Sequence, residues 1–428
     1  MPTIVARLLL CMGFFAHSLA VARADEAALH QHMDLFGNYE LSPGQVLTGG
    51  PWEDGQVLFM EATNIADGGV FTRADADSFE SVFPPGKSFR VVRDAAGDVT
   101  ALDWQAGAGS TVRAQRVHPQ AREDVSIESG DVTLSGSLFL PVGPGPHPCI
   151  VLVHGSGDSD RYMGPWVTFF LQSGVGVFTY DKRGVGLSTG DWRDGSYAAL
   201  ADDAVAAVEY LASRDDVDAG RIGIHGSSEG GWVAPLAATR SSHVSFLIVR
   251  VGPGQPVAET VLYEMRWDLR EKNLTGEELE QVIGLSRSIF DAASRGDAWE
   301  SLHAIVDPVR DTAWYRKAYG SGGPRGGGER MWNWHVANVH VDPAASVRQL
   351  DIPVLWFLAE QDENVDTAAS EPLLRAAFEA APTTDHELRV LPGANHAFFV
   401  MRDGQPSYTL GYWDAMAEWL ASRGWASE

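Results

Sequence analysis

The chain has 428 residues, of which 45% are hydrophobic and 21% are charged. This composition excludes a disordered chain and supplies enough apolar side chains for a large core, and the length predicts more than one domain. The 57 Asp and Glu residues outnumber the 32 Lys and Arg residues, and the formal net charge is −25. Because such a surface repels nucleic-acid phosphates and anionic lipid, we expect neither to be a partner.

The first 24 residues have the layout of a secretory signal peptide. Arg7 supplies a positive charge, residues 8–16 form an apolar run, and residues 22–24 give an A-x-A cleavage pattern before Asp25. The run is too short to span a bilayer, although cleavage after residue 20 and an uncleaved anchor are alternatives. We therefore expect a secreted or periplasmic protein with no membrane span after cleavage.

Residues 25–123 predict a small antiparallel β domain. Short apolar runs such as residues 56–60, 88–92 and 99–102 are separated by turns rich in Gly and Asp. Regular spacing of short strands with such turns is typical of an all-β unit. No catalytic residues stand out in it, so we interpret it as an accessory domain.

Residues 124–428 predict an α/β domain. Continuous apolar runs at residues 148–153, 176–180, 246–249 and 354–358 are typical of strands that are buried on both faces. Helical patterns lie between these runs. Alternation of strands and helices predicts a mostly parallel sheet that is flanked by helices.

The alternation is interrupted at about residues 252–350, where we expect an inserted helical lid. Residues 275–278, Thr-Gly-Glu-Glu, have the spacing of a capping box at a helix start. A glycine-rich stretch at residues 320–328 suits a loop. An insertion without a gating role is the alternative.

Ser228 is the predicted nucleophile. Residues 226–230 read Gly-Ser-Ser-Glu-Gly, which fits G-x-S-x-G, and they lie between a predicted strand and a predicted helix. This chemistry needs a tight turn that exposes one hydroxyl, and the helix N-terminus favours the negative charge that develops there.

A serine hydroxyl needs a base, and His396 and Asp362 are the candidates that complete a triad. Both follow predicted strands, and the chain order Ser, Asp, His is the order of α/β hydrolases. Glu360 and Glu363 are rivals of Asp362 for orienting the imidazole.

The oxyanion hole is expected to consist of backbone N–H groups. Residues 154–157, His-Gly-Ser-Gly, follow another buried strand, and we expect the amide of Ser156 to be one donor, with Gly155 as the next choice. The amide of Glu229, directly after the nucleophile, would be the second donor.

The chain resembles bacterial α/β-hydrolase carboxylesterases, particularly a branch related to thermophilic EstD-type esterases. Three stretches carry the resemblance, namely residues 154–157, 181–188 and 226–231, together with the loops of Asp362 and His396. It covers about residues 124–428 and implies the α/β-hydrolase fold, the triad and, more weakly, an ester substrate.

The sequence therefore predicts a serine esterase that acts on a small-molecule ester or other acyl substrate through an acyl-enzyme. A peptidase or amidase and an acyl thioesterase would use the same triad, and a non-enzymatic binding role for the β domain is a further alternative. No cofactor is expected. No metal site is expected either, because His335 and His340 lack partners at ligand spacing. The sequence leaves the oligomeric state open.

Overall fold

The computed structural model describes residues 32–426, apart from residues 44, 52–55, 62–67, 84, 108, 118–120, 162, 321–322, 325–326, 403–404 and 410. The predicted signal peptide, residues 1–24, lies outside these described residues. Within them, no helix combines the length and the apolar character that crossing a membrane requires.

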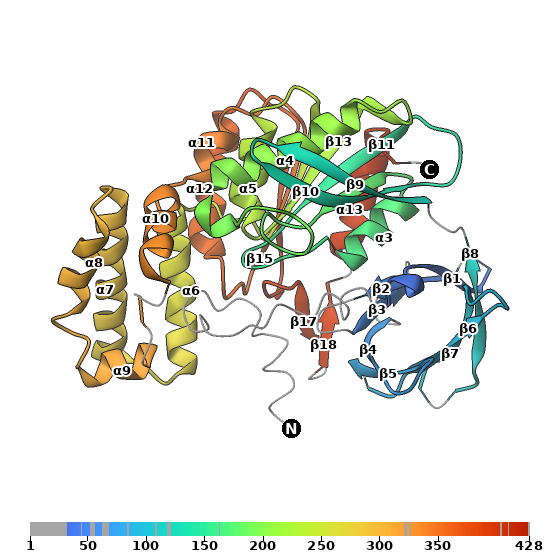
Figure 1. Cartoon of the computed structure of the whole chain (residues 1–428), viewed down its shortest axis with the longest axis horizontal. Coiled ribbons are helices and arrows are strands. Elements are labelled where there is room, and N and C mark those ends of the chain that lie inside the picture. The colour runs from blue at the N-terminus through green and yellow to red at the C-terminus, as the bar shows by residue number, and fades with distance from the viewer. Residues whose placement is uncertain are drawn as a thin grey trace.

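Eight antiparallel strands near the N-terminus close into a barrel, which lies at the lower right of Figure 1. They are β1 (Gly37–Ser42), β2 (Gln45–Pro51), β3 (Val57–Glu61), β4 (Gly69–Arg73), β5 (Ser78–Phe83), β6 (Ser88–Arg93), β7 (Val99–Gln105) and β8 (Val112–Val117), and η1 (Met33–Leu35) precedes them. The barrel closes because β1 also pairs with β8, with Tyr39 opposite Arg116. The predicted antiparallel β domain is confirmed, and its closure leaves no unpaired edge strand.

Aromatic side chains fill the barrel. Phe59, Phe71, Phe89 and Trp104 are each at most 3% exposed, and their ring centroids lie 5.0–6.3 Å apart. They come from four different strands and meet at the centre, so the interior of this barrel is a packed core.

The second unit contains an eight-stranded, mostly parallel sheet, as predicted. Its strands are β9 (Ala121–Ser129), β10 (Val132–Leu140), β11 (His147–Val153), β12 (Gly176–Tyr180), β13 (Val217–Ser227), β14 (Val244–Arg250), β15 (Val354–Ala359) and β16 (His386–Leu391). Their order is β16-β15-β14-β13-β11-β12-β10-β9. Strands β11 to β16 are parallel, and β10 is antiparallel to both β9 and β12.

Helices cover both faces of this sheet (Figure 1). α3 (Gly164–Gln172) and α13 (Gly411–Ser422) pack into one apolar cluster. α4 (Tyr197–Ala212), α5 (Gly230–Ala238) and α12 (Thr367–Glu379) pack into the other cluster. The short η4 (Trp192–Asp194) precedes α4, and a hairpin of β17 (Phe399–Arg402) and β18 (Gln405–Tyr408) precedes α13.

Six helices lie between β14 and β15, and the first five of them lie to the left of the sheet in Figure 1. They are α6 (Val257–Glu271), α7 (Gly276–Ser294), α8 (Trp299–Val306), α9 (Ala313–Tyr319), α10 (Gly328–Asn338) and α11 (Pro343–Val347). Thr275 is the N-cap of α7, but its side chain accepts no capping hydrogen bond, so the predicted capping box is wrong. Gly276 has a φ of 56°, which takes the first turn of α7 away from the geometry that a capping box needs.

The barrel packs against the α3 side of the second unit. Phe36 stacks on Phe139 of β10 with ring centroids 5.2 Å apart, and Leu58 of β3 packs against the same apolar cluster. The side-chain amide of Gln172 in α3 donates to the hydroxyl of Thr48 in β2. Apolar and polar contacts thus join the two units.

Candidate active site

Ser228 occupies a strained turn between β13 and α5. Its φ is 54°, a left-handed conformation that is uncommon for a residue other than glycine. Its amide donates to the carbonyl of Arg250 at 2.9 Å, and its own carbonyl accepts from the amide of Gly231 at 2.7 Å. These bonds hold the turn, whose shape is that of a nucleophile elbow.

Glycines allow the strand and the helix at this turn to approach each other closely. A Cβ atom on Gly226 would lie 2.4 Å from the carbonyl oxygen of Gly230. A Cβ atom on Gly231 would lie 2.4 Å from the Cα atom of Gly252. Both distances are far below van der Waals contact with backbone atoms, so the turn requires glycine at these positions.

The structure brings the three predicted triad residues together. The Nε2 atom of His396 lies 3.0 Å from Ser228 Oγ, and its Nδ1 atom lies 2.8 Å and 3.0 Å from the two carboxylate oxygens of Asp362. His396 is 4% exposed and Asp362 is 2% exposed. The imidazole therefore bridges the hydroxyl and the carboxylate in a site that excludes most water.

The two rival carboxylates contact the backbone of the histidine loop instead. Glu360 Oε2 accepts from the amide of Gly393 at 2.7 Å, and Glu363 Oε2 accepts from the amide of His396 at 3.2 Å. Both side chains therefore stabilise the loop, while Asp362 contacts the imidazole ring.

Arg250, at the end of β14, links the serine turn to the histidine loop. Its guanidinium donates to Ser227 Oγ at 2.9 Å and to the carbonyl of His396 at 3.0 Å. It also lies over the rings of Phe398 and Trp166, 4.7 Å and 5.2 Å from their centroids. No motif surrounds Arg250 in the sequence, so no sequence pattern marks it as part of the site.

A buried ion pair lies beside the nucleophile. Lys182 Nζ lies 2.6 Å from Glu229 Oε1, and both side chains are at most 2% exposed. The same ammonium donates to the carbonyls of Gly155 and Gly157 at 2.9 Å and 3.1 Å. Burial raises the pKa of the Glu229 carboxyl, and the charge of Lys182 opposes this rise.

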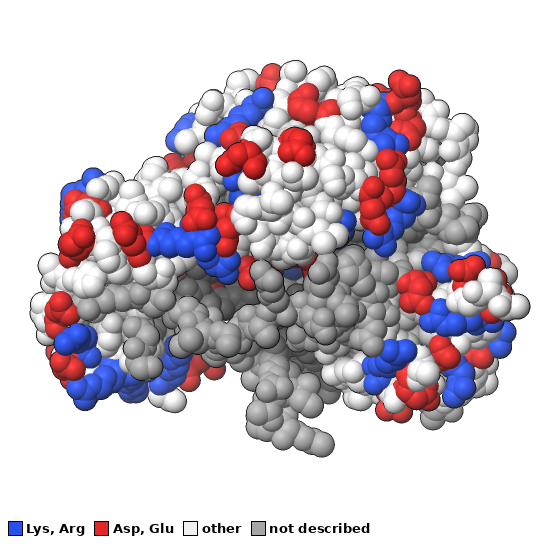
Figure 2. Space-filling view, viewed as in Figure 1, with Lys and Arg blue, Asp and Glu red and all other residues white. Residues whose placement is uncertain are grey.

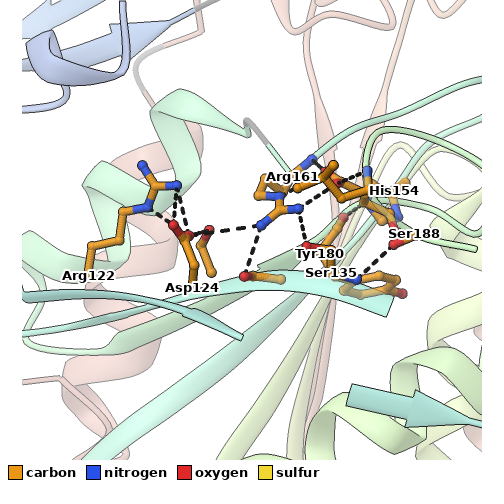
Figure 3. A network of polar contacts seen from close by, with 11 residues as sticks. Arg122, Asp124, Ser135, His154, Arg161, Tyr180 and Ser188 are labelled. Atoms are coloured by element: carbon orange, nitrogen blue, oxygen red, sulfur yellow. Dashed lines mark hydrogen bonds and ion pairs between the residues drawn. The ribbon is translucent and has the colours of Figure 1, made fainter. Parts of the chain in front are cut away.

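A polar network around Arg161 joins the neighbouring strands and loops (Figure 3). Arg161 donates to both carboxylate oxygens of Asp181, at 2.9 Å and 2.5 Å, and to the hydroxyl of Ser135 at 2.5 Å. The ring of His154 lies 2.5 Å from the carbonyl of Tyr180, and burial lowers the pKa of His154 to about 4. The lowered pKa and the contact with the Tyr180 carbonyl fit a structural role for His154.

Both predicted oxyanion donors lie beside the nucleophile. Ser156 lines the same cavity as Ser228, and Glu229 is the residue at the start of α5. Within the described part of the chain, the backbone amide of neither residue donates a hydrogen bond. Both amides are therefore left available by the residues that the structure describes.

A narrow cavity of about 20 Å³ opens onto Ser228. Its wall combines two aromatic rings, three apolar side chains and five polar side chains, and part of it comes from α6. The lining residues are Ser156, Tyr197, Ser228, Trp232, Pro253, Thr260, Val261, Glu264, Asn364 and Val365. Trp314 and Trp332 pack within the helical insertion, where they contact Tyr315 and the carbonyl of Asp297. Trp334 of α10 packs instead against Tyr197, which lines the cavity, with ring centroids 5.7 Å apart.

Comparison with known proteins identifies the family. A sequence model of the alpha/beta hydrolase family matches residues 150–406, which is more than half of the chain. The chain belongs to the alpha/beta hydrolase family. The matched range of this hydrolase contains Ser228, Asp362 and His396.

Individual relatives of this hydrolase are distant. Esterase EstD of Thermotoga maritima is 30% identical over 160 residues, which cover 35% of this chain and 38% of that protein. The bifunctional esterase/perhydrolase DCH of Acinetobacter calcoaceticus is 27% identical over 245 residues, which cover 52% of this chain and 77% of that protein. A solved esterase of Pyrococcus furiosus superposes with a TM-score of 0.44 at 17% identity, over 71% of this chain and 91% of that one.

Proposed function

We propose that this protein is a serine hydrolase that cleaves carboxylic esters, with Ser228, His396 and Asp362 as its catalytic residues. The continuous line of hydrogen bonds from the Ser228 hydroxyl through the His396 imidazole to the Asp362 carboxylate carries the proposal. The names of two relatives, both esterases, support the ester as the bond that is cleaved.

In the proposed reaction, Asp362 accepts a hydrogen bond from Nδ1–H of His396, which leaves Nε2 free to take the Ser228 proton. Ser228 Oγ then attacks the ester carbonyl carbon. The negative oxygen that forms is stabilised by the amides of Ser156 and Glu229, and one such donor is typically worth about 100- to 1,000-fold in rate. The protonated His396 gives its proton to the leaving alcohol.

Deacylation repeats these roles with water. His396 removes a proton from a water molecule, the resulting hydroxide attacks the acyl-enzyme carbonyl, and the proton returns to Ser228 Oγ as the acid leaves. The narrow cavity beside Ser228 suits a small acyl or alcohol group.

We also propose that the protein is exported and acts on small molecules. The signal-peptide pattern of residues 1–24 supports export. Figure 2 shows one face on which Lys and Arg side chains lie among Asp and Glu side chains, a distribution that offers no continuous basic patch there for a polyanion.

The test is hydrolysis by the purified mature protein of acyl groups that are matched across ester, anilide and thioester bonds. We expect turnover of the p-nitrophenyl ester at a kcat/KM that exceeds those of the p-nitroanilide and the thioester, and no turnover above background by Ser228→Ala. Faster cleavage of the anilide would identify the protein as an amidase instead of an esterase, and faster cleavage of the thioester would identify it as a thioesterase. Activity of Ser228→Ala equal to that of the unmodified protein would contradict the proposed role of the triad.

A further inference from the structure

The cavity beside Ser228 contains an acidic side chain that the proposed reaction does not use. Glu264 of α6 lines this cavity and is 9% exposed. One of its carboxylate oxygens accepts from the side-chain amide of Asn364 at 3.1 Å, and Asn364 lines the same cavity. The carboxyl is thus positioned by a neighbour in the wall of the substrate site.

The surroundings of Glu264 are acidic. Burial raises its pKa well above the usual value, and the negative charges of Asp268, Asp362 and Glu363 raise it further. No basic side chain belongs to the lining of this cavity within the described residues. The carboxyl therefore lies in a negative potential that no Lys or Arg of the lining neutralises.

The two cations nearest the triad are engaged elsewhere. Lys182 is bound to Glu229 and to the carbonyls of Gly155 and Gly157. Arg250 donates to Ser227 and to the carbonyl of His396. Neither is therefore available as a counter-ion for Glu264.

The remaining wall of the cavity suits a small cation. The rings of Tyr197 and Trp232 stack with centroids 5.5 Å apart, and both rings line the cavity. The hydroxyl of Thr260, one helical turn before Glu264, is buried and has no hydrogen-bond partner among the described residues. Aromatic faces attract ammonium groups, and a space of this size accommodates one or two water-sized groups.

We propose that Glu264 binds an ammonium group of the substrate, so that the preferred esters carry a primary amine on a short chain. This proposal rests on the esterase function proposed above and names its substrate class. An ammonium would donate a charge-assisted hydrogen bond to Glu264, donate another to the hydroxyl oxygen of Thr260 and lie against the aromatic rings. A carboxyl at this position costs free energy when the cavity holds only an alkyl group, because the alkyl group gives it no hydrogen bond beyond the one from Asn364.

The test compares esters whose ammonium is replaced by a methyl group of similar size. In the first pair, β-alanine ethyl ester and ethyl butanoate, the replaced group lies on the acyl side. In the second pair, 3-aminopropyl acetate and butyl acetate, the replaced group lies on the alcohol side. At pH 7, where alkylammonium is charged, we expect kcat/KM of one amine ester to exceed that of its neutral partner. Glu264→Gln, which keeps the shape and removes the charge, should lower that ratio by about ten-fold or more.

Glu271→Gln is the matched control, because Glu271 is the exposed last residue of α6 and does not line the cavity. It should keep the ratio of the unmodified protein. A measurement that needs no variant is inhibition of ethyl butanoate hydrolysis, in which propylammonium should act at a concentration about ten-fold or more below that of 1-propanol.

The outcomes separate the two proposals. Hydrolysis of neutral esters with no amine preference in either pair, or a preference that Glu264→Gln retains, would overturn the role of Glu264 and leave the esterase intact. No hydrolysis of any of the four esters would overturn the esterase itself.

Discussion

The Lys182 ammonium donates a 2.9 Å hydrogen bond to the carbonyl oxygen of Gly155. That carbonyl shares a planar trans peptide unit with the amide of Ser156, so the N–H of Ser156 points away from Lys182. The same ammonium pairs with the carboxylate of Glu229, whose amide is the second proposed oxyanion donor. One buried charge thus contacts the residues on both sides of the proposed oxyanion hole.

Lys182→Met should lower both stability and activity. It leaves Glu229 as a buried acid without its partner, and breaking such a pair typically costs about 3–5 kcal/mol of unfolding free energy. It also releases the Gly155 carbonyl, so kcat should fall. Urea unfolding and ester hydrolysis measure the two effects.

The double variant Lys182→Met/Glu229→Gln separates them. It removes the unpaired acid, so stability should recover in part, but kcat should stay low because the Gly155 carbonyl still lacks its donor. Full recovery of kcat in the double variant would show that Lys182 does not orient the Ser156 amide.

Asp362→Asn should reduce kcat by about 10⁴-fold, because an amide at this position no longer stabilises the imidazolium or selects the productive tautomer of His396. Glu363→Gln keeps an oxygen acceptor near the His396 amide and should lose less than about ten-fold, since neutral acceptors still form such bonds. Steady-state kinetics on one ester measure both variants. A larger loss in Glu363→Gln than in Asp362→Asn would reassign the acid of the triad.

Gly231→Ala should destabilise the fold, whereas Gly284→Ala should stabilise it. A Cβ atom on Gly231 would meet the backbone of Gly252 at 2.4 Å, and overpacking typically costs about 1–3 kcal/mol. Gly284 is exposed in α7 and has open space around it, so alanine should add about 0.5–1 kcal/mol there. Urea unfolding measures the change in unfolding free energy of each variant. Equal changes in the two variants would contradict the close approach of α5 to Gly252.

Buried histidines should make the protein sensitive to acid. Burial lowers the pKa of His335 and of His154 to about 4, and burial together with Arg250 lowers that of His225 to about 3. Below the ordinary value of 6.5 the unfolded chain binds protons that the folded chain does not, so stability is full above pH 6.5 and falls as the pH drops below it. Each such group should cost about 2 kcal/mol at pH 5.

His335→Gln tests this acid sensitivity, because it removes one of the three groups at a position in α10 that does not line the cavity at Ser228. Urea unfolding at pH 7.5 and pH 5.0 should show a smaller loss of stability in the variant, by about 2 kcal/mol. The same loss in both proteins would mean that His335 does not contribute to the acid sensitivity.

The sequence predicted the sheet and the meeting of the triad side chains well, because both have local signals. Buried strands read as continuous apolar runs, and the glycines around Ser228 mark a turn that few other structures need. The N-terminal strands were also visible as short runs. Their closure into a barrel was not, because it depends on pairing between Tyr39 of β1 and Arg116 of β8, far apart in the sequence.

The residues that sequence analysis missed act through contacts that no motif records. Glu264 is one acid among 57 Asp and Glu, and only the packing of α6 against the site distinguishes it. Lys182 and Arg250 act through backbone carbonyls, which any sequence supplies. The choice among Asp362, Glu360 and Glu363 likewise depended on which carboxylate the imidazole reaches.

The most direct test of the central claim is active-site labelling with a fluorophosphonate, read by intact mass and by peptide mapping. The protein should gain one adduct, located on Ser228, and Ser228→Ala should gain none while its circular dichroism spectrum stays unchanged. Undiminished labelling of Ser228→Ala, or an adduct on another serine of the folded protein, would contradict the account.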